Sequence, residues 1–188
     1  RACYLYIVDE NNNLTDIEGQ TAYAVFADNG EVVQLSTESM SAVCSLPDQN
    51  KILLISTDGN IYTKTGLSGE VMQETDENPA IGTFQQIIEG ENGDITILFT
   101  LNGENNANAY AIMYDSELSA WSERINLTDT ENYVEGISGG YVDGQMVFLY
   151  NQRELDMSGE NYIDTNSLHW STVAGKTVQL SDAEADFF

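Results

Sequence analysis

Four short stretches of this chain read alike, and their spacing is the feature that most limits how the chain can fold. Each contains an amide side chain that directly follows an apolar residue, and a hydroxyl and an acid come shortly after it: VQLSTE at 33–38, MQETD at 72–76, INLTD at 125–129 and VQLSD at 178–182. Successive copies begin 39, 53 and 53 residues apart, at Val33, Met72, Ile125 and Val178. A period of about 40 to 50 residues is typical of four-stranded propeller blades. We therefore predict an array of repeated sheets.

Each repeat divides into short segments with the residue pattern of β-strands. The segments alternate or run apolar, are rich in β-branched and aromatic residues, and are bounded by Asp-Gly, Ser-Gly and similar turn signals. The last repeat predicts strands at 135–142, 145–151, 166–173 and 176–180, and the third at 82–89, 94–101, 109–114 and 121–127. The second predicts strands at 40–46, 51–56, 60–64 and 70–73, and the first, which lacks an opening strand, at 3–8, 21–27 and 31–35.

The pattern predicts an all-β protein built as a β-propeller or a propeller segment, with about four blades of four antiparallel strands. We interpret residues 1–188 as one domain with blades near 1–36, 37–74, 75–127 and 128–181, while 182–188 begins or closes a further blade. A ring closed within the chain and a segment completed by more chain or a second copy both fit. We favour the segment, because an incomplete circle exposes a sheet edge and apolar blade faces. A plain β-sandwich is the alternative fold.

The charge excludes two classes of partner. Asp and Glu number 31 against 6 Lys and Arg, and the formal net charge is -25. Such a surface repels nucleic-acid phosphates and anionic lipid headgroups. The sequence has no apolar run of about 18 residues, so we expect no membrane insertion. Cys3 and Cys44 fall on neighbouring strands of adjacent predicted blades, where one disulfide or two buried thiols would fit.

Three turns carry a resemblance to a known family. The segments Tyr114–Trp121, Ser56–Tyr62 and Asp28–Val33 resemble degenerate Asp-boxes, the Ser-x-Asp-x-Gly-x-x-Trp turns of sialidase-like propellers. The box is a structural device, in which the Asp accepts backbone N–H bonds, Gly supplies a positive φ and the aromatic residue packs between strands. The resemblance therefore supports the fold and implies an extracellular, secreted or cell-surface protein.

The resemblance also implies glycoside hydrolysis as an alternative function. A sialidase-like enzyme would hold its substrate carboxylate with an arginine cluster, but only Arg153 of the three arginines falls on a predicted loop at the mouth of the propeller. We therefore expect no sialidase activity from this segment and assign no catalytic residue.

The acids that close the repeats are candidate metal ligands. The pairs Thr37-Glu38, Thr75-Asp76, Thr128-Asp129 and Ser181-Asp182 would lie around one face of a propeller. Ca²⁺ takes 6 to 8 oxygen ligands at roughly 2.3–2.6 Å, so Asp76, Asp129 and Asp182 are the residues that we would assign to it. The competing interpretation is that these side chains only cap the turn into the next strand.

Aromatic and basic residues of the last repeat are candidate ligand contacts. Tyrosine and tryptophan rings stack on sugars, although aromatic residues at alternating strand positions also build cores. The residues selected are Tyr133, Arg153, Tyr162, His169 and Trp170. We predict a non-catalytic binding module that recognises carbohydrate or a surface protein. A structural spacer within a large surface protein is the further alternative.

Overall fold

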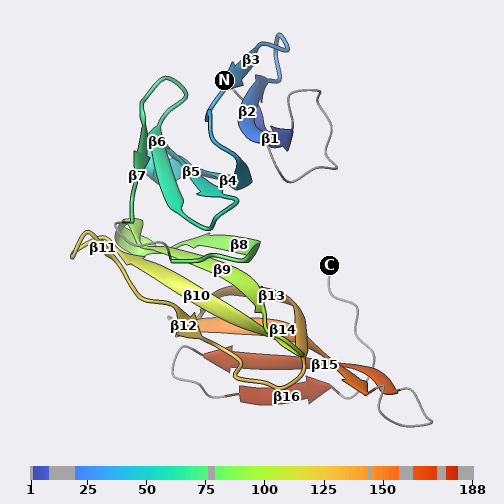
Figure 1. Ribbon diagram of the computed structural model, residues 1–188. Coiled ribbons are helices and arrows are strands. Elements are labelled where there is room, and N and C mark those ends of the chain that lie inside the picture. The colour runs from blue at the N-terminus through green and yellow to red at the C-terminus, as the bar shows by residue number, and fades with distance from the viewer. Residues whose placement is uncertain are drawn as a thin grey trace. The chain divides into compact units, whose positions relative to one another are not determined.

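The computed structural model describes residues 2–8, 20–75, 79–143, 145–156, 163–172 and 177–181. Within these ranges, β-strands are interrupted only by turns, irregular segments and two short 3-10 turns, η1 (Pro47–Gln49) and η2 (Glu91–Gly93). The predicted all-β class with several antiparallel sheets is therefore confirmed (Figure 1). The chain divides into two compact units, Arg1–Ile81 and Gly82–Phe188, which are described separately below.

The first unit contains two sheets, each an antiparallel meander in chain order. The first sheet is β1 (Cys3–Val8), β2 (Thr21–Phe26) and β3 (Val32–Gln34), and the second is β4 (Met40–Leu46), β5 (Lys51–Ser56), β6 (Ile61–Thr65) and β7 (Val71–Gln73). This up-and-down order is that of a propeller blade.

The two sheets of the first unit pack on a shared apolar core. Ala22 and Ala24 of β2 present small side chains, while Ile52 and Leu54 of β5 fill the space opposite them. Cys3 lies on β1 and Cys44 on β4, and both are free thiols.

The second unit contains two further meanders whose strands pair with each other at one position. The first consists of β8 (Thr83–Glu89), β9 (Ile95–Asn102) and β10 (Ala107–Asp115), with the short strands β11 (Ala120–Trp121) and β12 (Ile125–Asn126) both pairing with β10. The second consists of β13 (Tyr133–Val142), β14 (Gln145–Asp156), β15 (Ile163–Thr172) and β16 (Thr177–Ser181). A single parallel bridge, Ala107 to Tyr133, connects the two meanders.

The core of the second unit repeats the small-against-large packing of the first. Ala109 and Ala111 of β10 face Phe148 and Tyr150 of β14 in one cluster. Gly139 allows the close approach, because a Cβ there would lie 2.9 Å from Phe148 Cδ1. Gln86 of β8 ties the meanders together: its Oε1 accepts the Gly139 N–H at 2.9 Å, and its Nε2 donates to the Gly139 carbonyl at 3.4 Å.

The repeated motif has a structural role that the hydrogen bonds explain. Leu127 donates its N–H to the Ala109 carbonyl, and the Thr128 hydroxyl accepts the Ala109 N–H at 3.1 Å. In the first repeat, Ser36 occupies the same position and accepts the Ala22 N–H at 3.1 Å. The hydroxyl therefore extends the sheet beyond the fourth strand. In the first repeat this residue is Ser36, one position before the predicted Thr37.

Two of the turns singled out in the sequence are fixed by local contacts. Asp115 Oδ1 accepts the N–H groups of Glu117 and Leu118, each at 2.9 Å, and Trp121 packs on Tyr114 with ring centroids 5.2 Å apart. In the β5–β6 turn, Gly59 has φ +88°, and a Cβ there would lie only 2.6 Å from the Ile81 nitrogen. Only glycine fits this turn without displacing the backbone.

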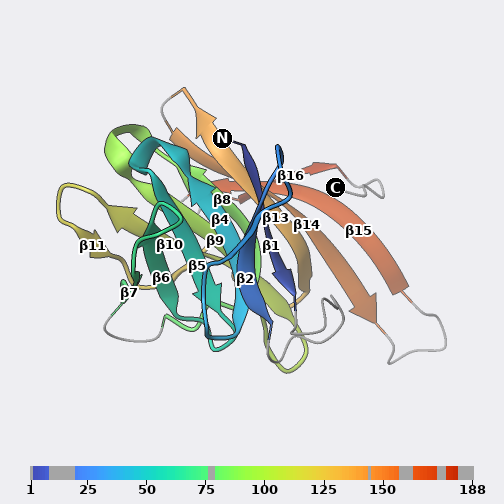
Figure 2. The same ribbon diagram turned by 90° about the horizontal axis from the view of Figure 1, so that it is seen from above.

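Two sequence predictions were wrong in detail. The predicted strand 121–127 is divided into β11 and β12. The predicted loop 152–165 is largely strand, because β14 and β15 remain paired from Val147–Thr172 to Asp156–Ile163 and run side by side in Figure 2. Arg153 therefore projects from β14 and not from a loop.

Candidate functional site

The strands that open the second, third and fourth repeats each carry a β-bulge near their N-terminal end, and two of these bulges build the site. The register shifts lie between Met40 and Ala42 in β4, Phe84 and Gln86 in β8, and Val134 and Gly136 in β13. The residues at the bulges are Ser41, Gln85 and Glu135. A bulge adds one residue to a strand and re-aims its side chain.

The bulge in β13 explains how a charged residue sits beside the core. Val134 and Ile137 both belong to the buried cluster, although residues three apart point to opposite faces of a regular strand. The extra residue restores both to the core face. Glu135 is left on the surface, with 41% of its side chain exposed.

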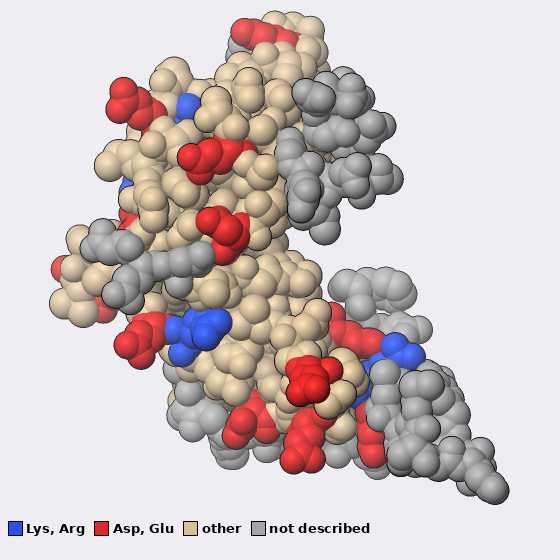
Figure 3. All heavy atoms as spheres, in the orientation of Figure 1, with Lys and Arg blue, Asp and Glu red and all other residues tan. Residues whose placement is uncertain are grey.

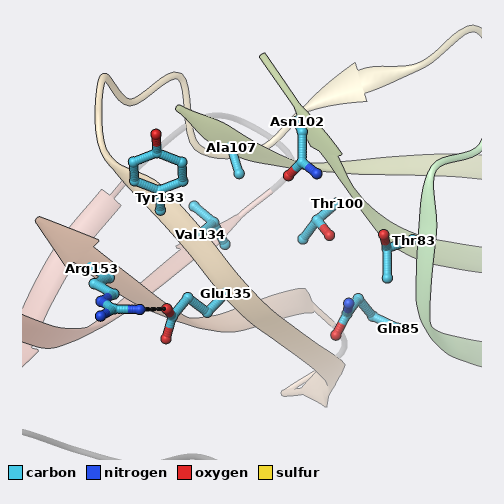
Figure 4. A pocket seen from close by; sticks show the side chains of 9 residues that line it. All are labelled: Thr83, Gln85, Thr100, Asn102, Ala107, Tyr133, Val134, Glu135 and Arg153. Carbon is cyan, nitrogen blue, oxygen red and sulfur yellow. Dashed lines mark hydrogen bonds and ion pairs between the residues drawn. The ribbon is translucent and has the colours of Figure 1, made fainter. Parts of the chain in front are cut away.

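A pocket of about 330 Å³ lies between β8, β9, β10, β13 and β14 of the second unit (Figure 4). Its floor is buried and its rim is polar, with Tyr133, Gln85 and Arg153 half-buried between them. The lining residues are Thr83, Gln85, Thr100, Asn102, Ala107, Tyr133, Val134, Glu135 and Arg153.

Strand pairing places four of these residues in one row across the unit. Asn102 pairs with Ala107, Ala107 with Tyr133, and Tyr133 with Arg153. Paired residues project from the same face of a sheet, so the row presents an amide, a small residue, an aromatic ring and a guanidinium side by side. Figure 4 shows Gln85 and Thr83 on the other side of the pocket.

The pocket uses equivalent positions of two successive repeats. Thr83 pairs with Thr100 two residues before the β8 bulge residue, and Tyr133 pairs with Arg153 two residues before the β13 bulge residue. The bulges supply Gln85 and Glu135. Two copies of the same backbone pattern therefore face one cavity with different side chains.

An ion pair dominates the electrostatics of the pocket. Arg153 Nη1 donates to Glu135 Oε1 at 2.9 Å, and the Arg153 side chain is 32% exposed. A pair this exposed is worth about 0–1 kcal/mol. Both groups are partly exposed, so each can also hydrogen-bond a ligand while the pair stays intact.

Asparagine side chains position Tyr133 by anchoring the segment before it. Asn108 Oδ1 accepts the Thr128 hydroxyl and the Thr130 N–H, each at 2.7 Å, and its Nδ2 donates to the Thr130 carbonyl at 3.1 Å. Asn106 Nδ2 donates to the same carbonyl at 2.9 Å. The connection between β12 and β13 is thereby fixed against the β9–β10 turn.

The structure brings together two of the five predicted ligand contacts, Tyr133 and Arg153. His169 and Trp170 lie on β15 and are not among the pocket residues. Tyr162 lies outside the described residues.

His169 is packed in the interior. Its ring stacks on Tyr150 with centroids 5.1 Å apart and an interplanar angle of 11°, and its Nε2 lies 2.8 Å from Ser167 Oγ. Burial lowers the pKa of His169, so the neutral imidazole is favoured. These contacts are those of a core residue.

Of the predicted calcium ligands, Asp129 alone lies in the described part of the chain. It is exposed, with φ 45°, and its N–H donates to Asn126 Oδ1 at 3.2 Å. Among the described residues, no three His, Cys, Asp or Glu side chains are grouped to hold a metal ion. Asp76 and Asp182 lie outside them, and calcium binding stays a prediction.

Sequence reasoning missed the polar partners of the pocket, notably Gln85, Asn102 and Glu135. A signal for the bulges is present, because the first strands of three repeats place apolar residues three apart where alternation requires two. The pairs are Met40 and Val43, Phe84 and Ile87, and Val134 and Ile137.

The surface reflects the composition. On the face shown in Figure 3, acidic side chains are spread over both units and basic ones are few. Over the residues that the structure describes, no helix has the length and hydropathy to cross a bilayer.

Comparisons with known proteins find similarity among solved structures. No model of a known protein family matches the sequence, and no curated protein matches it. Among solved structures, the crystal structure of the tricorn protease is similar over 89% of this chain, with 14% sequence identity and a TM-score of 0.46. The aligned region is 16% of the length of that protein.

Proposed function

We propose that this chain is a non-catalytic binding module that recognises carbohydrate through the pocket around Tyr133. The proposal rests on one observation. Side chains from two successive repeats place an aromatic ring, two amides and an ion pair around a single cavity. A concave site with a few placed polar groups is the usual form of a small-ligand site.

The side chains match the chemistry of sugar hydroxyls, which both donate and accept hydrogen bonds. Gln85 and Asn102 offer a donor and an acceptor each, Arg153 only donates and Glu135 only accepts. Within the row, the Tyr133 ring adds an apolar face suited to the C–H face of a sugar ring. The buried floor at Thr100, Ala107 and Val134 gives this arrangement a rigid base.

The same geometry favours binding over hydrolysis. Most glycosidases use two carboxyl groups across the scissile bond. In the described lining, Glu135 supplies the carboxylate, and Arg153 engages it at 2.9 Å. We keep the secreted or cell-surface location as part of the proposal, with a surface protein as the alternative ligand and a spacer without ligand as the alternative role.

A glycan array followed by titration calorimetry on the best ligand tests this function. Tyr133→Ala should weaken binding about tenfold, the equivalent of about 1.4 kcal/mol, through loss of the stacking surface. Tyr141→Ala is the matched control, because Tyr141 lies on the same strand, is 50% exposed and does not line the pocket.

Unchanged glycan affinity in the Tyr133 variant would show that the glycan does not bind beside Tyr133. Absence of any glycan ligand for the wild-type protein would contradict the carbohydrate assignment and leave a surface protein or a spacer role.

A further inference from the structure

Resting on the proposed function, we infer that the pocket selects uncharged sugars and excludes acidic ones, with Glu135 as the specificity-determining residue. Uronic and sialic acids carry a carboxylate, and the cation available to receive it in the described lining is Arg153. The geometry around this arginine decides which sugars can bind.

Glu135 already occupies the position that a ligand carboxylate would take. Its Oε1 accepts from Arg153 Nη1 at 2.9 Å, and Figure 4 shows the two side chains pointing toward one another across the end of the pocket. An acidic sugar would have to displace this carboxylate or lie beside it, and two adjacent carboxylates repel. Sugar hydroxyls, in contrast, can donate to Glu135 and accept from Arg153 while the pair stays intact.

The backbone at Glu135 is held in place by its neighbours on both sides. Val134 before it and Ile137 after it are both buried in the core, and Gly136 pairs with Asn151 on β14. The bulge is therefore fixed on both sides, so the backbone that carries the Glu135 side chain stays at the pocket beside β14.

The surroundings strengthen the selection. Glu131 precedes Tyr133 by two residues, Glu154 follows Arg153, and both are exposed. The whole chain carries a net charge of -25. Charges within about 8 Å still interact at physiological ionic strength, so an approaching anion meets repulsion that a neutral or amine-bearing sugar does not.

The inferred preference for uncharged sugars differs from what the resemblance to sialidase-like propellers implies. The resemblance implies that a sialidase-like site would hold its acid with a cluster of arginines. The described lining of this pocket contains one arginine, Arg153, and it is ion-paired with Glu135.

Affinity electrophoresis with matched soluble polysaccharides tests the inference at 150 mM NaCl. The probes are galactan and polygalacturonate, and mannan and polymannuronate, together with an array of neutral and acidic oligosaccharides. We expect the wild-type protein to bind one or more neutral members at least about tenfold more tightly than the acidic counterpart. Glu135→Gln should narrow this ratio about tenfold, because a charge-assisted hydrogen bond to Arg153 becomes available to the ligand.

Glu154→Gln is the matched control, since it removes the same charge next to Arg153 in the sequence and does not line the pocket. Equal shifts in the two variants would overturn the role of the ion pair. Wild-type protein that binds acidic sugars as tightly as neutral ones would overturn the selectivity and leave the carbohydrate function standing. Failure to bind any sugar would overturn the proposed function, and the inference with it.

Discussion

Two residues with reactive side chains, Cys44 and His169, are held in uncharged forms by burial. Desolvation raises the pKa of the Cys44 thiol to about 11 and lowers the pKa of His169. In each case burial disfavours the charged form, which is the thiolate for cysteine and the imidazolium for histidine. Both residues therefore act as packing groups at neutral pH.

We predict that Cys44 reacts slowly with alkylating reagents. The thiolate is the nucleophile, and raising the thiol pKa from 9.0 to about 11 lowers its thiolate fraction at pH 8. The loss is roughly a hundredfold relative to the unfolded chain. The measurement is the iodoacetamide rate of the Cys3→Ser variant, whose remaining cysteine is Cys44, with and without denaturant. A native rate equal to the denatured rate would show that the thiol is accessible to solvent.

At the scale of the element, the sequence predicts strands well wherever alternation and turn signals agree. The bounds of β1, β4 and β5 match the predictions residue for residue. The prediction failed at the last strand of the third repeat. There the Ser122 hydroxyl accepts the Met113 N–H at 3.0 Å and replaces a backbone partner, so the strand divides.

Only part of the site could be predicted from the sequence, because the remaining residues depend on the register in which the strands pair. Tyr133 and Arg153 could be chosen by residue type, because an aromatic ring and a guanidinium are common ligand contacts. Gln85 and Glu135 depend on bulges, which shift the pairing of whole strands. No local property of these two residues reveals that their strands meet at one cavity.

Two adjacent glycines in β13 give a prediction about packing between the meanders. A Cβ at Gly139 would lie 2.9 Å from Phe148 Cδ1 and 3.1 Å from Ile88 Cδ1, whereas nothing lies within 4 Å of one at Gly140. Gly139→Ala should therefore lower the free energy of unfolding by about 1–3 kcal/mol through overpacking. Gly140→Ala should be close to neutral. Urea titration measures both, and equal effects would contradict this account of the packing.

At the scale of the whole molecule, charge and repetition set the properties. Each unit contains two meanders packed small-against-large, and a net charge of -25 is spread over their surfaces. A completed ring, its blade number and the contribution of a second copy or further chain stay predictions. Self-repulsion between the acids, however, has a direct consequence for stability.

We expect sodium chloride to stabilise the protein against heat. Raising the concentration from 20 to 300 mM shortens the range of repulsion between carboxylates and should raise the melting temperature at pH 7. Scanning calorimetry measures the change. Near pH 4.1, where the sequence has its isoelectric point, the salt effect should shrink, because much of the charge is gone. A melting temperature that is insensitive to salt at pH 7 would show that repulsion does not limit stability.

The bulges give the fold a place where chemistry can change without cost to the core. Ser41, Gln85 and Glu135 occupy corresponding places in three repeats, and they carry a hydroxyl, an amide and a carboxylate on one backbone pattern. Residues next to each bulge that face the interior can keep their core contacts whichever side chain the bulge residue carries. A library randomised at Gln85 and Glu135 alone would therefore alter ligand preference on a constant scaffold, which makes this chain a starting point for engineered recognition.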